Sequence, residues 1–260
     1  MAVLTPRGGL AALIASALLL TGCGSRSDGP AAPAASGPKV VATTTWEAGF
    51  AKAAGATDVV VIVPLSVAHA PDYDPKPSDL AAVADADFVL FAPFEGFARK
   101  ITDAAGSDAK TVEVALDNSR DKVKAEVARL AKLFGTEDSA ARWTTAFDAE
   151  YAKLAEQVKA AWPGGQRPKV VAQAFVGYAA DLAGAQVLGV YGPEPITASQ
   201  VADLSGKAPQ FVFENTHMST GTVLADSPAK QVMLVNYPTA DLDLLDVYRT
   251  NARTITDAMR

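Results

Sequence analysis

The chain contains only two histidines, His69 and His217, and each stands in a segment that follows a predicted strand. His69 comes after the apolar run that ends at Val63, and His217 comes after the run 211–213. A neutral imidazole can bind a divalent metal ion or donate a hydrogen bond to a polar solute. Because ligands of open α/β sheets collect beyond the carboxyl ends of the strands, these two positions are the first candidates for a binding site.

Carboxylates share this placement. The loops after the predicted strands also carry Glu95, Glu214, Asp241 and Asp243. The sequence therefore places imidazole and carboxylate groups in a few loops of each half of the chain.

Eight β-branched or apolar runs predict eight strands, and helix-forming segments separate them. The strands are expected at 39–45, 59–63, 88–91, 111–116, 170–175, 186–190, 211–213 and 232–235. The stretch 119–161 has no strand signal and carries a predicted break at 134–136. This alternation predicts an α/β fold with two lobes, each a mainly parallel four-stranded sheet flanked by helices, joined by a long bridging helix. Ser78 is expected to cap the helix 78–84.

The only cysteine of the chain, Cys23, closes a short apolar stretch near the N-terminus. A positive residue, Arg7, precedes the uncharged run 10–20, which is too short for a stable transmembrane helix. Leu20-Thr-Gly-Cys23 resembles the bacterial lipobox, whose cysteine is acylated. The alternative is an ordinary secretory peptide with an incidental cysteine. We expect an extracytoplasmic protein that is anchored to the cell membrane by a lipid on Cys23.

The expected organisation has five parts. A lipoprotein signal peptide (1–22) precedes a flexible tether rich in Gly, Ser, Pro and Ala (23–37). The N-terminal lobe covers 38–118, the helical connector with the bridging helix 119–165, and the C-terminal lobe 166–260. The formal net charge of −6 argues against a nucleic-acid partner.

One segment resembles a known family. Asp72-Tyr-Asp-Pro-Lys-Pro-Ser-Asp79, followed by Ala84-Asp-Ala-Asp87, is similar to a conserved segment of the metal-binding proteins of zinc and manganese ABC importers. Further similar pieces are Ala174-Phe175 with Tyr178 and the terminal segment 242–253. The resemblance implies two α/β lobes, a metal ion as cargo in the cleft between them, and a membrane permease as partner. We expect a monomer.

The departures from that family indicate a histidine-poor branch. Pro71 stands where the family's first histidine is usual, and His69 lies two positions upstream. The family's second and third histidines have no counterpart, so the usual three-histidine site is impossible here. Pro93-Phe-Glu-Gly96 and Glu214-Asn-Thr-His217 resemble segments of a less common branch of the family. This resemblance implies a site formed by His69, Glu95 and His217, with Glu214, Asp241 or Asp243 as the fourth ligand. Imidazole and carboxylate suit zinc first and manganese next.

Alternative interpretations stay open for the site and for the function. His69 can be a loop residue bonded to backbone carbonyls, His217 a helix cap, and Glu95 a carboxylate at a helix N-terminus. A protein of the same fold could instead bind a small organic or chelated-metal solute. An enzyme is not expected, because the sequence has no Gly-x-Ser-x-Gly, no cysteine in the body of the protein and no His-Glu-x-x-His.

Overall fold

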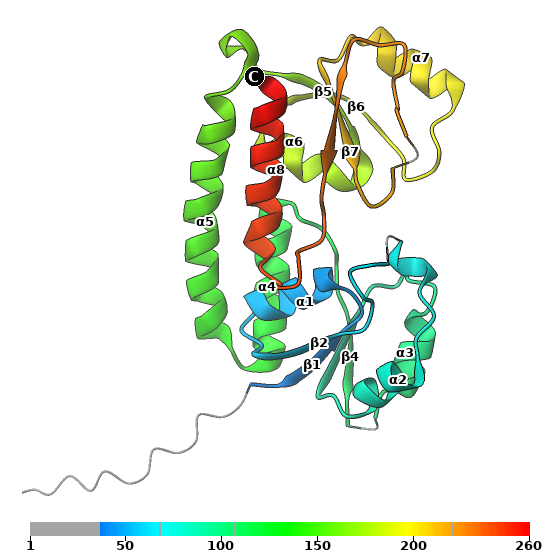
Figure 1. The fold of residues 1–260 in the computed structure, drawn as a ribbon. Coiled ribbons are helices and arrows are strands. Elements are labelled where there is room, and N and C mark those ends of the chain that lie inside the picture. The colour runs from blue at the N-terminus through cyan, green and yellow to red at the C-terminus, as the bar shows by residue number, and fades with distance from the viewer. Residues whose placement is uncertain (1–36, 68, 107, 220) are drawn as a thin grey trace, which may run out of the picture. The chain divides into compact units, whose positions relative to one another are not determined.

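The computed structural model describes residues 37–67, 69–106, 108–219 and 221–260. Within these ranges the chain forms two four-stranded sheets with helices on both faces (Figure 1). The predicted lipidation site Cys23 lies outside the described residues, as do the predicted signal peptide and nearly all of the tether. No helix in the described ranges has the length and apolar character needed to cross a bilayer.

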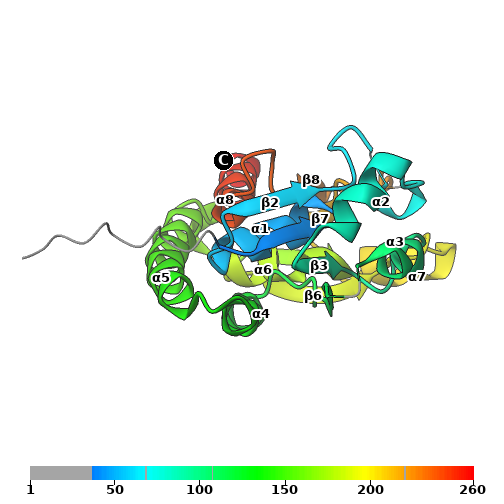
Figure 2. The same cartoon turned by 90° about the horizontal axis from the view of Figure 1, so that it is seen from below.

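The N-terminal lobe is built on a parallel sheet with the strand order β2-β1-β3-β4. Its strands are β1 (Lys39–Ala42), β2 (Asp58–Val61), β3 (Phe88–Phe91) and β4 (Lys110–Glu113). Its helices are α1 (Thr45–Ala53), the 3-10 turn η1 (Ala70–Asp72), α2 (Pro77–Ala84) and α3 (Ala98–Ala104). Helix α1 covers one face of the sheet, and α2 and α3 cover the other (Figure 2). Burial on both faces explains the continuous apolar runs in the sequence.

Two long helices follow the first lobe. They are α4 (Arg120–Phe134) and α5 (Glu137–Lys159). Gly135 ends α4 in the left-handed conformation at φ +69°, which glycine adopts at little cost. The 3-10 turn η2 (Pro163–Gly165) then ends the helical region. The predicted helix break at 134–136 is confirmed.

The C-terminal lobe repeats the topology of the first, with the strand order β6-β5-β7-β8. Its strands are β5 (Lys169–Gln173), β6 (Gln186–Tyr191), β7 (Phe211–Asn215) and β8 (Lys230–Leu234). Its helices are the 3-10 turn η3 (Ala174–Val176), α6 (Gly177–Leu182), α7 (Ala198–Gly206) and α8 (Leu244–Met259). In each lobe the carboxyl ends of the parallel strands form one edge of the sheet, so the loops beyond them are neighbours.

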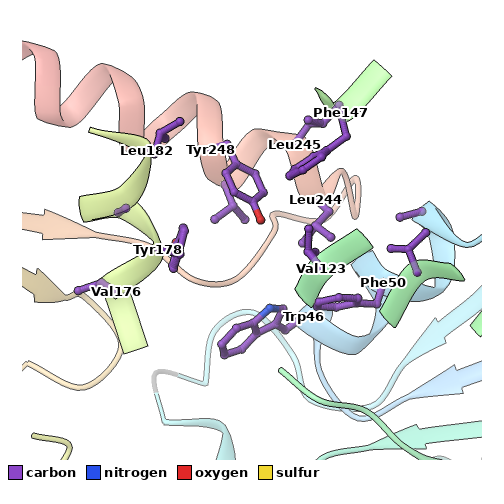
Figure 3. Close-up of a cluster of buried hydrophobic side chains, with 14 of the residues drawn as sticks. Trp46, Phe50, Val123, Phe147, Val176, Tyr178, Leu182, Leu244, Leu245 and Tyr248 are labelled. Atoms are coloured by element: carbon purple, nitrogen blue, oxygen red, sulfur yellow. The ribbon is translucent and has the colours of Figure 1, made fainter. Parts of the chain in front are cut away.

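A single apolar core runs from one lobe into the other along α8. Tyr248 of α8 is fully buried, with Tyr178 and Leu182 of the second lobe on one side and Val123 of α4 on the other (Figure 3). Its hydroxyl donates a hydrogen bond to the backbone carbonyl of Asn118, at 2.7 Å. Helix α8 therefore fixes the segment through which the chain leaves the first lobe.

The predicted fold class is confirmed, and each predicted strand is present, at 88–91 with the predicted bounds and elsewhere with one or both ends shifted by a few residues. The predicted cap at Ser78 is wrong. Helix α2 begins at Pro77, whose missing N–H suits the first turn, and Lys76 is the capping residue. The Asp79 carboxylate, at the third helical position, accepts a hydrogen bond from the backbone N–H of Lys76 at 2.8 Å.

Candidate metal centre

Glu95 is a buried carboxylate just beyond the end of β3. Only 3% of the residue is exposed, and its Oε2 accepts a hydrogen bond from the backbone N–H of Ala92 at 3.1 Å. Burial raises the pKa of Glu95 to about 8, and the neighbouring Glu47 carboxylate adds to the rise, while the Ala92 N–H opposes it. At neutral pH this group holds a proton unless a cation compensates its charge.

Glu47 comes to the same place from helix α1. The helix starts with a capping box, in which Thr44 is the N-cap and Glu47 is the third helical residue. The Glu47 Oε2 accepts a hydrogen bond from the backbone N–H of Thr44 at 3.1 Å and another from the Thr44 hydroxyl. Glu47 is fully buried, and burial raises its pKa, against the opposing hydrogen bonds from Thr44.

His217 supplies the imidazole from the second lobe. It follows β7, and its backbone N–H donates to the Asn215 side-chain oxygen at 3.0 Å, which turns the chain at the strand end. The ring packs edge-on against Tyr237, with 4.5 Å between the ring centroids. Burial lowers the pKa of His217. The ring is therefore neutral at neutral pH, which is the form that binds a metal.

The loop after β8 carries Asn236 and Tyr237 into the space between the lobes. The Asn118 side-chain amide donates to the Asn236 carbonyl at 3.1 Å, and the Trp46 indole donates to the Asn118 side-chain oxygen at 2.8 Å. Trp46 also packs against Tyr237, with 5.2 Å between the ring centroids. Burial raises the pKa of Tyr237, and the carboxylates of Glu47 and Glu95 add to the rise. Tyr237 therefore contacts His217 and lies near the two carboxylates.

Five side chains around Tyr237 each bring a buried polar atom that has no hydrogen-bond partner among the described residues. We call them the polar cluster: Thr43 (Oγ1), Glu47 (Oε1), Glu95 (Oε1), His217 (Nε2) and Asn236 (Oδ1). A buried polar group without a partner costs about 1–3 kcal/mol, and a charged one costs more. The donor types of the polar cluster, imidazole nitrogen and carboxylate, amide and hydroxyl oxygen, are those found in divalent-cation sites.

His69 faces the same cavity as His217 without joining the polar cluster. A cavity of about 300 Å³ between the lobes is lined by both histidines. The His69 side chain is about half exposed, and its Nδ1 lies 2.9 Å from an Asp72 carboxylate oxygen. This pairing is local, since Asp72 is three residues away on η1.

Glu214 lies on the other face of β7. Side chains alternate along a strand, so Glu214 shares a face with Val212, while Asn215 faces the inter-lobe cavity. Both carboxylate oxygens are satisfied, one by the Tyr191 hydroxyl and one by the backbone N–H of Asn215, each at 2.8 Å. Burial raises the pKa of Glu214, and the two hydrogen bonds oppose the rise.

Asp241 and Asp243 stand at the start of α8. Asp243 is the N-cap, its Oδ1 accepts from the backbone N–H of Leu245 at 3.0 Å, and its Oδ2 lies 2.9 Å from the Arg249 guanidinium. Asp241 accepts from the Thr239 hydroxyl at 2.8 Å. Neither residue lines the cavity that holds the two histidines.

In the described part of the chain, no three histidine, cysteine, aspartate or glutamate side chains are grouped closely enough to hold a metal ion. The structure brings Glu95 and His217 into one cluster around Tyr237, places His69 at the rim of the cavity, and sets the other three predicted ligands apart. Reasoning from the sequence missed Glu47, whose only signal was the capping pattern Thr44-x-x-Glu47. It also missed Asn236, which is an unremarkable polar residue after a strand.

No protein-family model matches the sequence, and no curated protein sequence matches it significantly. Solved structures do match its fold. The laminin binding protein Lmb of Streptococcus agalactiae, described as bifunctional with adhesin and metal transporting activity, superposes with a TM-score of 0.65 at 17% identity. The match covers 86% of this chain and 100% of that one.

Two further structures agree with this match. The SBP FpvC of Pseudomonas aeruginosa in complex with Ni²⁺ gives a TM-score of 0.64 at 16% identity, over 85% of this chain and 96% of that one. A zinc-bound deletion mutant of ZnuA gives a TM-score of 0.62 at 20% identity, and the match covers 85% of this chain and 98% of that one. The chain has the fold of these proteins. Their two-lobed architecture is the one that the sequence predicts.

Proposed function

We propose that this protein is an extracytoplasmic solute-binding lipoprotein of an ABC importer that captures a divalent transition metal, zinc or manganese, between its lobes. The fold supports the proposal, because the matching structures include a zinc-bound ZnuA and a nickel-bound FpvC. The resemblance of the segment 72–87 to metal-importer proteins supports it independently. No enzymatic activity is part of the proposal.

The polar cluster carries the proposal. Glu95 Oε1 and His217 Nε2 belong to different lobes, and neither atom has a partner in the described parts of the chain. A divalent ion would satisfy both atoms and would offset the cost of burying the carboxylate. It would also link the two lobes at their strand ends.

Our ligand assignment follows from these positions. Glu95 and His217 bind the ion directly. His69 becomes a further ligand when its loop moves inward, because its imidazole then gives up its contact with Asp72 and binds the ion. Water completes the coordination shell until then. The proposed ligand set does not include Glu214, Asp241 or Asp243, because their carboxylates already accept hydrogen bonds. The donors are the Tyr191 hydroxyl, the Thr239 hydroxyl and the backbone N–H of Leu245 at the start of α8, respectively.

Delivery depends on the predicted lipid anchor. Acylation of Cys23 holds the protein at the cell membrane, and the tether lets the lobes reach a permease in the same membrane. The core shared by both lobes and α8 limits hinge opening, so we expect small loop and lobe shifts when the ion binds.

Metal binding by the purified mature protein tests this function. Isothermal titration with Zn²⁺ and with Mn²⁺ is expected to give one ion per chain for the wild type and a strongly weakened site in the His217→Gln variant. Asp243→Asn is the matched control and is expected to bind as the wild type does. Absence of saturable binding of either ion by the wild type would contradict the proposal.

One observation favours a second candidate, a chelated metal or a small organic solute. The cavity between the lobes is larger than a bare ion needs, and its lining includes Phe94 of the first lobe and Phe175 of the second, which are 55% and 40% exposed. Aromatic walls suit an organic ligand. A thermal shift with metal chelates, and none with the free ions, would favour this candidate.

A further inference from the structure

The cavity between the lobes is large enough for an organic molecule. Its volume is about 300 Å³. The pockets that bind small molecules in proteins start at about this size, and a dry cavity of ~150 Å³ already takes a benzene molecule. By that comparison the inter-lobe cavity has room for about two fused aromatic rings.

The walls of this cavity are mainly aromatic and apolar. Phe94 follows β3 in the first lobe, Phe175 lies on η3 in the second, and both line the cavity while remaining exposed. Trp46 and Tyr237, which pack against each other, line it as well. Exposed apolar side chains that gather around a cavity indicate a binding site, whereas scattered ones need no explanation. These aromatic rings offer flat surfaces to a flat ligand.

The lining carries no formal charge from acidic or basic side chains. Among the described residues, no aspartate, glutamate, lysine or arginine lines this cavity. Burial lowers the pKa of His217, so its ring is uncharged at neutral pH. An ionised organic molecule would lose hydration here without meeting an opposite charge in the lining, so the cavity favours an uncharged one. The polar lining residues are His69, Asn215, His217 and Asn236.

Asn236 gives this lining a specific polar group. The residue is 1% exposed, and its side-chain oxygen has no hydrogen-bond partner in the described ranges. A buried acceptor without a donor is costly, and an N–H or O–H group of a ligand would supply the donor. An apolar pocket with one such polar group is the usual composition of a small-molecule site.

We propose that the inter-lobe cavity binds an uncharged, flat organic molecule of about two fused aromatic rings with a hydrogen-bond donor on its edge. Phe94 and Phe175 cover the rings from the two lobes, and the Asn236 side-chain oxygen accepts from the donor. The inference rests on the second candidate of the proposed function and narrows it to one class of ligand. It does not depend on metal capture, for which Glu95 and His217 are the proposed ligands.

Indole and benzofuran are suitable probes, because they share the same two fused rings and differ in one edge group. Indole presents an N–H donor, and benzofuran has an oxygen at that position. Isothermal titration of the metal-free mature protein is expected to give one indole per chain. Benzofuran is expected to bind at least ~10-fold more weakly, since it leaves the buried oxygen of Asn236 without a partner.

The Asn236→Leu variant tests the polar contact. Leucine has a similar volume and lacks the acceptor, while the backbone carbonyl at this position still accepts a hydrogen bond from the Asn118 amide. We expect this variant to bind indole and benzofuran with equal affinity. An unchanged preference for indole would overturn the role of Asn236, and so would equal affinities in the wild type.

The Phe175→Ala variant tests the cavity wall, and Leu133→Ala is its matched control. Leu133 of α4 is exposed to the same degree, 39% against 40%, and does not line the cavity. Phe175→Ala is expected to weaken both probes at least ~10-fold through lost stacking and apolar contact, and Leu133→Ala is expected to bind as the wild type does. Equal effects of the two substitutions would mean that the probes bind elsewhere, and would overturn the inference.

Indole-3-carboxylate tests the charge of the ligand. At neutral pH it is an anion, so we expect it to bind at least ~10-fold more weakly than indole. Tighter binding of the carboxylate would overturn the assignment to uncharged molecules.

The outcomes separate this inference from metal capture. No saturable binding of indole or benzofuran overturns the inference, and the titrations with Zn²⁺ and Mn²⁺ still decide metal capture. Binding of indole with the expected preference, by a protein that binds neither ion, supports the inference and contradicts metal capture.

Discussion

Glu95 and Glu214 occupy similar positions in the two lobes and differ in what surrounds their carboxylates. Each glutamate lies at the carboxyl end of a parallel strand, and each is 3% exposed. Glu214 has one hydrogen bond on each oxygen, from Tyr191 and from the backbone of Asn215. Glu95 has one satisfied oxygen, and its Oε1 lacks a partner among the described residues.

The difference shows that burial of a carboxylate at a strand end does not by itself mark a ligand. Glu214 is built into the fold of the second lobe, on the face of β7 that packs away from the inter-lobe cavity. Glu95 shares its surroundings with Glu47, Tyr237 and His217. The incomplete hydrogen bonding of Glu95 is therefore the distinguishing feature.

The largest expected effect follows from exchanging each glutamate for glutamine. Glu95→Gln is expected to lower the affinity for Zn²⁺ and Mn²⁺ by at least ~100-fold, because a ligand charge is lost. Glu214→Gln is expected to keep metal binding and to lose about 1–3 kcal/mol of unfolding free energy, because the charge-assisted bond from Tyr191 is weakened. Isothermal titration and chemical denaturation measure the two effects. Equal effects of both substitutions on metal affinity would remove the contrast between the lobes.

A smaller effect concerns the stability of the metal-free protein between pH 6.5 and 8.5. The pKa of Glu95 is about 8 in the folded state and 4.5 as the reference value. The folded state therefore keeps a proton that the unfolded chain has released, and stability falls as the pH rises through this range. His217 does not contribute there, because its folded pKa is lowered from 6.5 and its effect belongs to more acidic pH.

Thermal unfolding of metal-free protein checks this expectation. The melting temperature of the wild type should fall from pH 6.5 to 8.5, and that of Glu95→Gln should fall less. Parallel curves for the two proteins would show that Glu95 does not hold the extra proton.

The fold could be predicted from the sequence because its signals are local and repeated. Every strand of both sheets contains apolar or β-branched residues, and the helix break at Gly135 follows from a residue that adopts positive φ readily. The start of α2 could not be fixed to the residue, since Lys76, Pro77, Ser78 and Asp79 all occur at helix starts. The structure assigns the capping oxygen to Asp79.

The site could be predicted only in part. Placement after strands pointed to Glu95 and His217, and it pointed equally to Glu214, whose side chain turns to the other face of β7. Strand alternation puts Glu214 on the face of Val212, but both faces of β7 are buried, so the sequence does not tell which face turns to the inter-lobe cavity. The burial of Glu47 was missed because a capping-box glutamate is ordinarily exposed, whereas this one is fully buried.

The location of the bound ion tests the central claim most directly. Crystals of the mature protein grown with Zn²⁺ or Mn²⁺, measured at the absorption edge of the metal, locate the ion by anomalous scattering. We predict one ion between the lobes, with a carboxylate oxygen of Glu95 and the Nε2 of His217 at about 2.0–2.2 Å from zinc. An ion bound at Glu214, or anywhere that touches neither Glu95 nor His217, would contradict the account.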